Sequence, residues 1–168
     1  MTGKTISVDA MGGDHAPEVV LDGIALFLGK RRDMKFILHG QADVLKAGIE
    51  RRGLSAACEI RDCPDVVSMD AKPSAALRKS KGTSMWGMID SVKTGEAQSG
   101  ISAGNTGALM AFSMLALRRM SGVHRPAMTA IWPTIKGRTV VLDVGANLDA
   151  DADQLVTYAV MGEAYMRA

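Results

Sequence analysis

The fold of this sequence is decided by one stretch, Gly100-Ile101-Ser102-Ala103-Gly104-Asn105-Thr106-Gly107-Ala108. It is typical of a strand end, followed by a loop of small and hydroxyl residues and then by a long apolar helix. Such a turn presents free backbone N–H groups at the positive end of a helix dipole, which suits an anion. Ser102, Asn105 and Thr106 add side-chain donors. Two interpretations stay open: a cradle for a phosphate or carboxylate, or an ordinary tight turn with small residues for helix–sheet packing.

Outward from this stretch, strands and helices alternate along the whole sequence. Further strands are expected over residues 5–10, 35–39, 57–62, 127–132 and 138–143, with Pro133 ending the strand over 127–132. Further helices are expected from Pro17, from Asp43, from Pro73, after Gly82-Thr83-Ser84 and from Asp149. The helix after Gly107 is apolar on nearly every side, so we expect it to be buried. The alternation predicts one α/β domain over residues 1–168, with a mostly parallel sheet and helices on both faces.

Composition excludes several classes of function. The 168 residues are 47% hydrophobic and 23% charged with a net charge of +2, which is ordinary for a soluble chain and argues against nucleic-acid binding. Cys58 and Cys63 are spaced too widely for a CxxC motif, so we expect reduced, structural thiols in a cytoplasmic protein. The first residues do not resemble a signal peptide, and the apolar run 108–117 is shorter than the about 20 residues that span a bilayer. The chain stops at Ala168 directly after a helix, which hints at further chain.

Three strand-end loops carry polar residues: Asp9–His15, Ser102–Gly107 and Asp143–Asn147. The carboxyl ends of parallel strands lie along one edge of a sheet, so we expect the three loops to line one crevice. Gly104 and Gly107 would let the backbone approach a ligand closely. His15 could act as a general base or stabilise an oxyanion, or it could be hydrogen-bonded structure only.

The charged residues of these regions leave alternatives open. Asp9, Asp14 and Asp143 could hold a metal ion, but no His, Cys or Asp set has ligand spacing, so none is expected. Lys79 and Lys81 could bind phosphate as point charges, or they could form a solvated basic helix end.

Several enzyme classes are disfavoured by missing motifs. The sequence has no Gly-x-Ser-x-Gly elbow, no Walker A motif and no dinucleotide fingerprint. An enzyme that uses phosphate itself as the nucleophile needs only an anion cradle, an oxyanion stabiliser and an acyl-chain groove. The residues of this sequence fit such an enzyme better than a covalent serine enzyme.

Three segments resemble signature segments of PlsX, the bacterial phosphate acyltransferase family of phospholipid synthesis: Val8–Pro17, Ser102–Ala108 and Leu142–Asn147. Pro73–Lys81 and Arg125-Pro126-Ala127 are also similar. The resemblance covers essentially all of this chain but only about the first half of the family's usual length. Two departures are local: Gly82-Thr83-Ser84-Met85 stands where Ser-Ser more often precedes Met, and Asp149–Asp153 replaces a stretch that usually carries Lys-Pro.

The resemblance implies a reaction in which an acyl-[acyl-carrier-protein] thioester and inorganic phosphate give acyl phosphate and free carrier protein. It also implies a three-layer α/β/α sandwich related to phosphate acetyltransferases, without an essential metal or other cofactor. The enzyme would be a cytosolic homodimer that can associate peripherally with the membrane.

Candidate site residues follow from the loops and the resemblance together. The expected catalytic residues are His15 and Asn105. The expected phosphate- or substrate-binding residues are Asp9, Gly12, Gly13, Asp14, Lys79, Lys81, Ser84, Ser102, Gly104, Thr106, Gly107, Asp143 and Asn147. One alternative function is a phosphotransacetylase acting on a short acyl-CoA. Another is a non-catalytic module that only binds phosphate or dimerises.

Overall fold

The structure is a computed structural model that describes residues 4–145 and 149–167. The chain divides into two compact units, Met1–Arg118 and Arg119–Ala168, and each is described by itself. That the two form a single domain stays a prediction.

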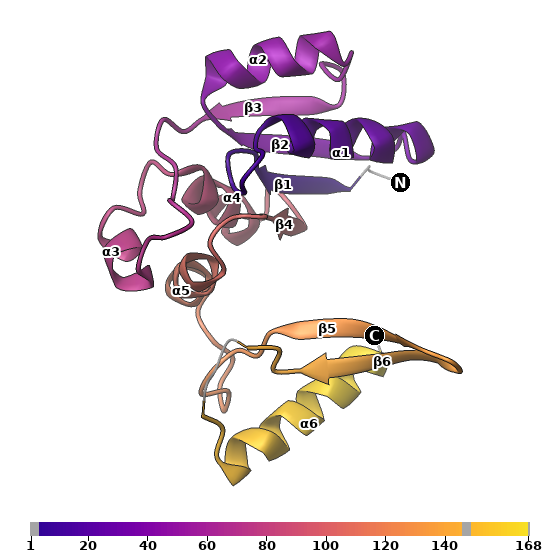
Figure 1. The fold of residues 1–168 in the computed structure, drawn as a ribbon, viewed down its shortest axis with the longest axis vertical. Helices are drawn as coiled ribbons and strands as arrows, with labels where there is room; N and C mark the ends of the chain where they lie inside the picture. The colour runs from indigo at the N-terminus through magenta and orange to yellow at the C-terminus, as the bar shows by residue number, and fades with distance from the viewer. Residues whose placement is uncertain (1–3, 146–148, 168) are drawn as a thin grey trace. The chain divides into compact units, whose positions relative to one another are not determined.

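The first unit is built on a four-stranded parallel sheet (Figure 1). Its strands are β1 (Thr5–Asp9), β2 (Lys35–Gly40), β3 (Cys58–Asp62) and β4 (Ser99–Ile101), in the order β3-β2-β1-β4. β1 is central, with Val8 opposite Leu38 of β2 and Ile101 of β4. The α/β fold class with a mostly parallel sheet is thereby confirmed.

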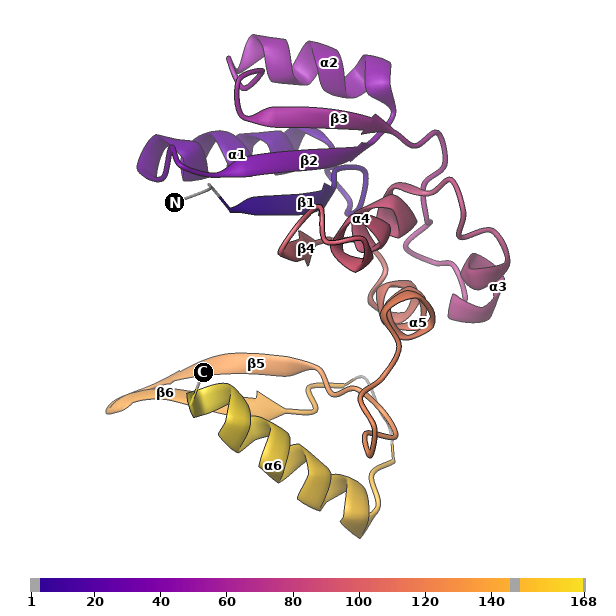
Figure 2. The same ribbon diagram turned by 180° about the vertical axis from the view of Figure 1, so that it is seen from behind.

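Helices cover both faces of this sheet, as Figures 1 and 2 show together. α1 (Glu18–Lys30) and α2 (Ala42–Arg51) cover one face, and α4 (Ser84–Lys93) packs against β1 and β2 on the other. The face under α1 and α2 is apolar: Val8 and Leu38 of the sheet pack with Leu21 of α1 and Leu45 of α2. This cluster is the larger core of the unit.

A second core joins α3 (Pro73–Arg78), α4 and α5 (Thr106–Leu117). The sequence predicts that α5 is buried, and the structure buries only part of it. Only Ala108, Phe112 and Ala116 of α5 are buried, a stripe with a spacing of one helical turn, while Leu115 and Leu117 are exposed. The reason is that α5 packs mainly on α3 and α4, which cover this stripe and leave the opposite side of the helix uncovered within its unit.

The second unit contains β5 (Thr129–Thr134), β6 (Gly137–Leu142) and α6 (Ala152–Arg167), with α6 packed on β6. β5 and β6 form an antiparallel hairpin, so they do not continue the parallel pattern expected from the sequence. Pro133 does not end β5 but lies within it, opposite Arg138. A two-stranded sheet has only edge strands, where a residue without an N–H is tolerated. In the part of the chain that is described, no helix has both the length and the apolarity to cross a membrane.

Candidate functional site

Two of the polar loops meet at the carboxyl ends of β1 and β4. The two strands are parallel neighbours, so their loops leave the sheet at the same edge. Asp9, the last residue of β1, is 2% exposed, and its Oδ2 accepts a hydrogen bond from Ser102 Oγ at 2.7 Å. Ser102 Oγ in turn accepts from the Gly104 N–H at 3.1 Å. The carboxylate of one loop thereby fixes the hydroxyl and the backbone turn of the other.

Glycines allow this close approach. A Cβ at Gly12 would clash with Asp9 Oδ2 and would lie 3.0 Å from the Gly104 nitrogen. Gly13 has a φ of +108°, and a Cβ there would lie 3.2 Å from the Ala103 carbonyl oxygen. Any other residue at Gly12 would force the two loops apart, and at Gly13 it would strain the backbone.

The N-terminus of α5 presents unused donors at this edge. Asn105 is the N-cap, and its Oδ1 accepts from the Ala108 N–H at 3.0 Å. Within residues 4–145 and 149–167, no group accepts a hydrogen bond from the N–H of Thr106 or Gly107. Both N–H groups lie at the positive end of the helix dipole, and the Thr106 hydroxyl adds a third donor on an exposed residue. We call these three groups the α5 cradle; their chemistry suits a phosphate or a developing oxyanion.

The amide of Asn105 is used within the protein. Its Nδ2 lies 3.2 Å from the Ser68 carbonyl oxygen, 2.8 Å from that of Met69 and 2.9 Å from that of Ala71. Asn105 is 8% exposed. Its side chain therefore connects the start of α5 to the segment between β3 and α3.

Residues 4–168 match the family described as "Fatty acid synthesis protein". The chain belongs to this family. It is 53% identical over 168 residues to the phosphate acyltransferase of Paracoccus denitrificans, covering 98% of this chain and 45% of the relative. The phosphate acyltransferases of Caulobacter vibrioides and Rhizobium meliloti are 50% and 51% identical, over 97% of this chain and 46% and 48% of the relatives.

The resemblance to the phosphate acyltransferase family is thereby confirmed. The chain spans about half the length of the curated relatives it matches.

The other predicted site residues belong to several parts of the chain. Asp14 and His15 are exposed on the loop after β1, beside the α5 cradle's own loop. Ser84 is 1% exposed at the start of α4, where its N–H donates to the Asp65 carbonyl oxygen at 3.1 Å. Asp143 belongs to the second unit, where its Oδ1 accepts from the Met128 N–H at 3.4 Å, and Asn147 lies outside the described residues. Of the three loops expected to line one crevice, the first two are thus shown in contact.

Lys79 and Lys81 line a hollow of about 530 Å³ that also includes Val67, Ser68 and Ala71. The residues that line it do not include the Ser102–Gly107 loop. The turn that Asn105 binds and the two lysines therefore line the same hollow. We call it the Lys79 hollow.

A buried polar group between the sheet and α4 was missed by sequence reasoning. His39, the partner of Asp9 across β1 and β2, is 3% exposed; its Nε2 lies 3.1 Å from Ser91 Oγ and its Nδ1 3.9 Å from Cys63 Sγ. Burial, with a smaller contribution from the Arg61 charge, lowers the pKa of His39 from 6.5 to about 4. The sequence offered one signal, which is a glycine inside a predicted helix. In the structure, a Cβ at Gly87 of α4 would clash with the His39 ring.

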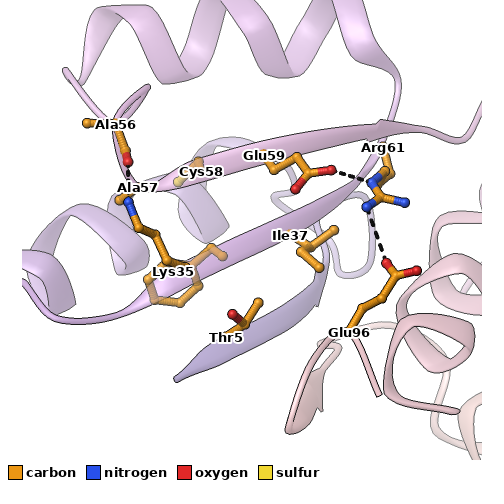
Figure 3. Close-up of a pocket in the computed structure, with 10 residues that line it drawn as sticks. Thr5, Lys35, Ile37, Ala56, Ala57, Cys58, Glu59, Arg61 and Glu96 are labelled. Atoms are coloured by element: carbon orange, nitrogen blue, oxygen red, sulfur yellow. Dashed lines mark hydrogen bonds and ion pairs between the residues drawn. The ribbon is translucent and has the colours of Figure 1, made fainter. Parts of the chain in front are cut away.

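A second hollow of about 490 Å³ lies over the starts of β1, β2 and β3 (Figure 3). Its charged groups are already paired. Arg61 bridges Glu59 at 2.6 Å and Glu96 at 3.2 Å, and Lys35 Nζ donates to the Ala56 carbonyl oxygen at 2.7 Å. Ligands of parallel sheets bind at the carboxyl ends of the strands, and this hollow lies mainly toward the opposite ends. The α5 cradle is therefore the better candidate.

A metal site would need several His, Cys, Asp or Glu side chains close together. Among them, no three His, Cys, Asp or Glu residues are grouped so that they could hold a metal ion.

Proposed function

We propose that this chain is part of a phosphate acyltransferase, which transfers an acyl group from an acyl-[acyl-carrier-protein] thioester to inorganic phosphate. The observation that carries the proposal is the α5 cradle, where Thr106 and Gly107 hold free N–H donors beside the loop after β1. Family membership and the name of the curated relatives support it. They favour it over a short acyl-CoA phosphotransacetylase and over a non-catalytic module.

In this proposal the cradle binds phosphate so that one of its oxygens faces the thioester carbon. A phosphate oxygen attacks that carbon, an O–C bond forms, the C–S bond breaks, and the phosphate proton ends on the leaving thiol. The helix dipole and the N–H groups stabilise the phosphate charge without needing a metal ion. His15, on the adjoining loop, would donate to the oxyanion, and the Asp9–Ser102 bond would hold the cradle's loop in shape.

The partners and the location remain part of the same proposal. The carrier protein is the acyl donor, phosphate is the acceptor, and the enzyme is a cytoplasmic homodimer with peripheral membrane contact. Lys79 or Lys81, from the hollow that they line, would help to bind phosphate or the developing thioester oxyanion. The third polar loop, with Asp143 and Asn147, would add substrate contacts.

The reaction is tested by trapping acyl phosphate with hydroxylamine. Because hydroxylamine also reacts directly with thioesters, the phosphate-free reaction is the background. We expect the 168-residue chain to raise hydroxamate from palmitoyl-carrier protein above that background only when phosphate is added. More product from acetyl-CoA than from palmitoyl-carrier protein would favour the phosphotransacetylase alternative. A folded chain that binds phosphate but forms no hydroxamate above the phosphate-free background from either donor would contradict the proposed activity of this chain.

A further inference from the structure

We propose that Asn105 is a positioning residue that couples the α5 cradle to the Ser68–Ala71 turn, so that an anion in the cradle stabilises the wall of the Lys79 hollow. The inference rests on the proposed function in one respect: phosphate is the anion that occupies the cradle.

The Asn105 side chain contacts both the start of α5 and the Ser68–Ala71 turn. Its Oδ1 accepts the Ala108 N–H and closes the first turn of α5. Its Nδ2 is surrounded by the carbonyl oxygens of Ser68, Met69 and Ala71, at 2.8 to 3.2 Å. An amide nitrogen carries two hydrogens, so the three acceptors share them, and no hydrogen is left to reach a substrate. This use of the amide favours positioning over direct contact with reacting atoms.

The Asn105 amide donates to a turn that lies outside the helices and strands. Residues 66–72 contain no helix or strand, and Met69 is 45% exposed. Within the turn, the Ala71 N–H donates to the Ser68 carbonyl oxygen at 3.1 Å. The Asp70 N–H donates to Ser68 Oγ at 3.4 Å, and at the end of the segment the Lys72 carbonyl oxygen accepts from the first turn of α3. Val67 and Ala71 also pack on the second core. A segment with few contacts of its own opens easily unless another element holds it, and here that element is Asn105, 34 to 37 residues away.

Coupling follows from the position of Asn105 at the start of α5. The cradle's N–H groups belong to Thr106 and Gly107, the next two residues along the chain. A bound phosphate restricts the backbone there, so Asn105 loses less conformational freedom when it binds the turn. By linkage, an ordered turn must favour phosphate binding by the same factor. Ser68 and Ala71 carry the effect to the hollow, because both line it.

Two variants separate the two halves of the side chain. Asn105→Asp keeps an oxygen that caps Ala108 but replaces the donating nitrogen with an oxygen. Asn105→Ser also keeps a capping oxygen and removes the donor without adding charge. Both variants therefore preserve the helix start and release the turn.

Hydrogen exchange followed by mass spectrometry on the full 168-residue chain gives the test. In both variants we expect peptides covering residues 66–72 to exchange at least about tenfold faster, while peptides covering 108–117 stay within about twofold of the wild type. Millimolar phosphate, compared with sodium chloride at equal ionic strength, should slow exchange of residues 66–72 in the wild type and not in the variants. A side chain that merely capped α5 would not produce this dependence on phosphate.

Each part of the proposal would be contradicted by a different result. Unchanged exchange of 66–72 in both variants would overturn the connection, and equal acceleration of 108–117 would reduce Asn105 to a helix cap. Phosphate that slows exchange at the start of α5 but not at 66–72 would overturn the coupling and leave the cradle standing. Phosphate that protects neither segment would overturn the proposed function and the coupling with it.

Discussion

The two faces of the four-stranded sheet differ in kind. The face under α1 and α2 is a continuous apolar core, whereas the face under α4 buries Ser7, Asp9 and His39. The difference is visible on one strand: Ser7 and Val8 are neighbours on β1, 0% and 4% exposed, and point to opposite faces. Among the described residues, Ser7 Oγ, Asp9 Oδ1 and Ser84 Oγ are buried without a hydrogen-bond partner.

The comparison indicates that the two faces of the sheet contribute differently to stability and to the site. Burying apolar side chains stabilises the fold, while burying polar groups without full hydrogen bonding costs stability. The costly face is the one whose strand end carries Asp9, and Asp9 holds the loop of the α5 cradle through Ser102. We infer that apolar burial under α1 and α2 offsets the cost of burying the polar groups under α4 that hold the site.

The largest expected effect is on the apolar face. Leu38 is fully buried among residues of both covering helices, so Leu38→Ala should lower the free energy of unfolding by about 3 kcal/mol through lost burial and a cavity. Urea unfolding reports it, with Trp132→Phe as the background so that Trp86 is the only tryptophan and reports on the first unit. The control is Leu26→Ala on α1, at a side chain that is 74% exposed. A loss below about 1 kcal/mol for Leu38→Ala would mean that this face is not the main core.

A smaller effect should appear on the polar face as a pH dependence. Folded His39 has a pKa of about 4, lowered by burial and by Arg61 against the opposing charges of Asp90 and Glu59. The unfolded chain, with a His pKa of about 6.5, therefore binds more protons between these values, and stability falls as pH falls. Between about pH 7 and about pH 5 the loss should be about 2 kcal/mol from this group.

The control for that effect is His39→Gln, which keeps a polar side chain that does not titrate. Its free energy of unfolding should change less over the same pH range than that of the wild type. Equal slopes would show that His39 is protonated in the folded protein or that other groups dominate.

The smallest effect should have the opposite sign. Ser7→Ala removes a buried hydroxyl that has no partner among the described residues, so stability should stay within about 1 kcal/mol of the wild type, on the stabilising side. Val8→Ala, one residue along on the apolar face, is the matched comparison and should destabilise. A clear loss of stability in Ser7→Ala would mean that its hydroxyl is hydrogen-bonded in solution, and the contrast between the faces would be weaker than stated.

The elements with strong local signals could be predicted from sequence. The Gly-Thr-Ser signal is confirmed, because Thr83 Oγ1 accepts from the Trp86 N–H at 3.2 Å and starts α4. Gly53, which follows the C-cap Arg52 of α2, has a φ of +65°, as is typical of a glycine at that position. The contact between the loops after β1 and β4 is also confirmed, because parallel pairing brings both strand ends to one edge.

What could not be predicted depends on contacts between distant residues. Ser102 meets Asp9 across 93 residues, and Asn105 finds its three carbonyl partners in an irregular segment with no motif. The strands around Pro133 look like members of a parallel sheet in composition, and only their pairing reveals a hairpin. The surroundings of His39 likewise depend on how α4 lies on the sheet. The assignment of His15 as catalytic stays a prediction.

The most direct test of the account asks whether phosphate binds at the start of α5. NMR amide shifts of the 168-residue chain are followed during a phosphate titration in the wild type, Thr106→Ala and Thr106→Pro. Proline is favoured at the first helical position, so Thr106→Pro removes one cradle N–H while the helix start is kept, and Thr106→Ala removes only the hydroxyl. We expect shifts at Gly104 to Gly107 in the wild type and an affinity at least about tenfold weaker in Thr106→Pro than in Thr106→Ala. Shifts elsewhere, or equal affinity of the two variants, would contradict the assignment of the α5 cradle.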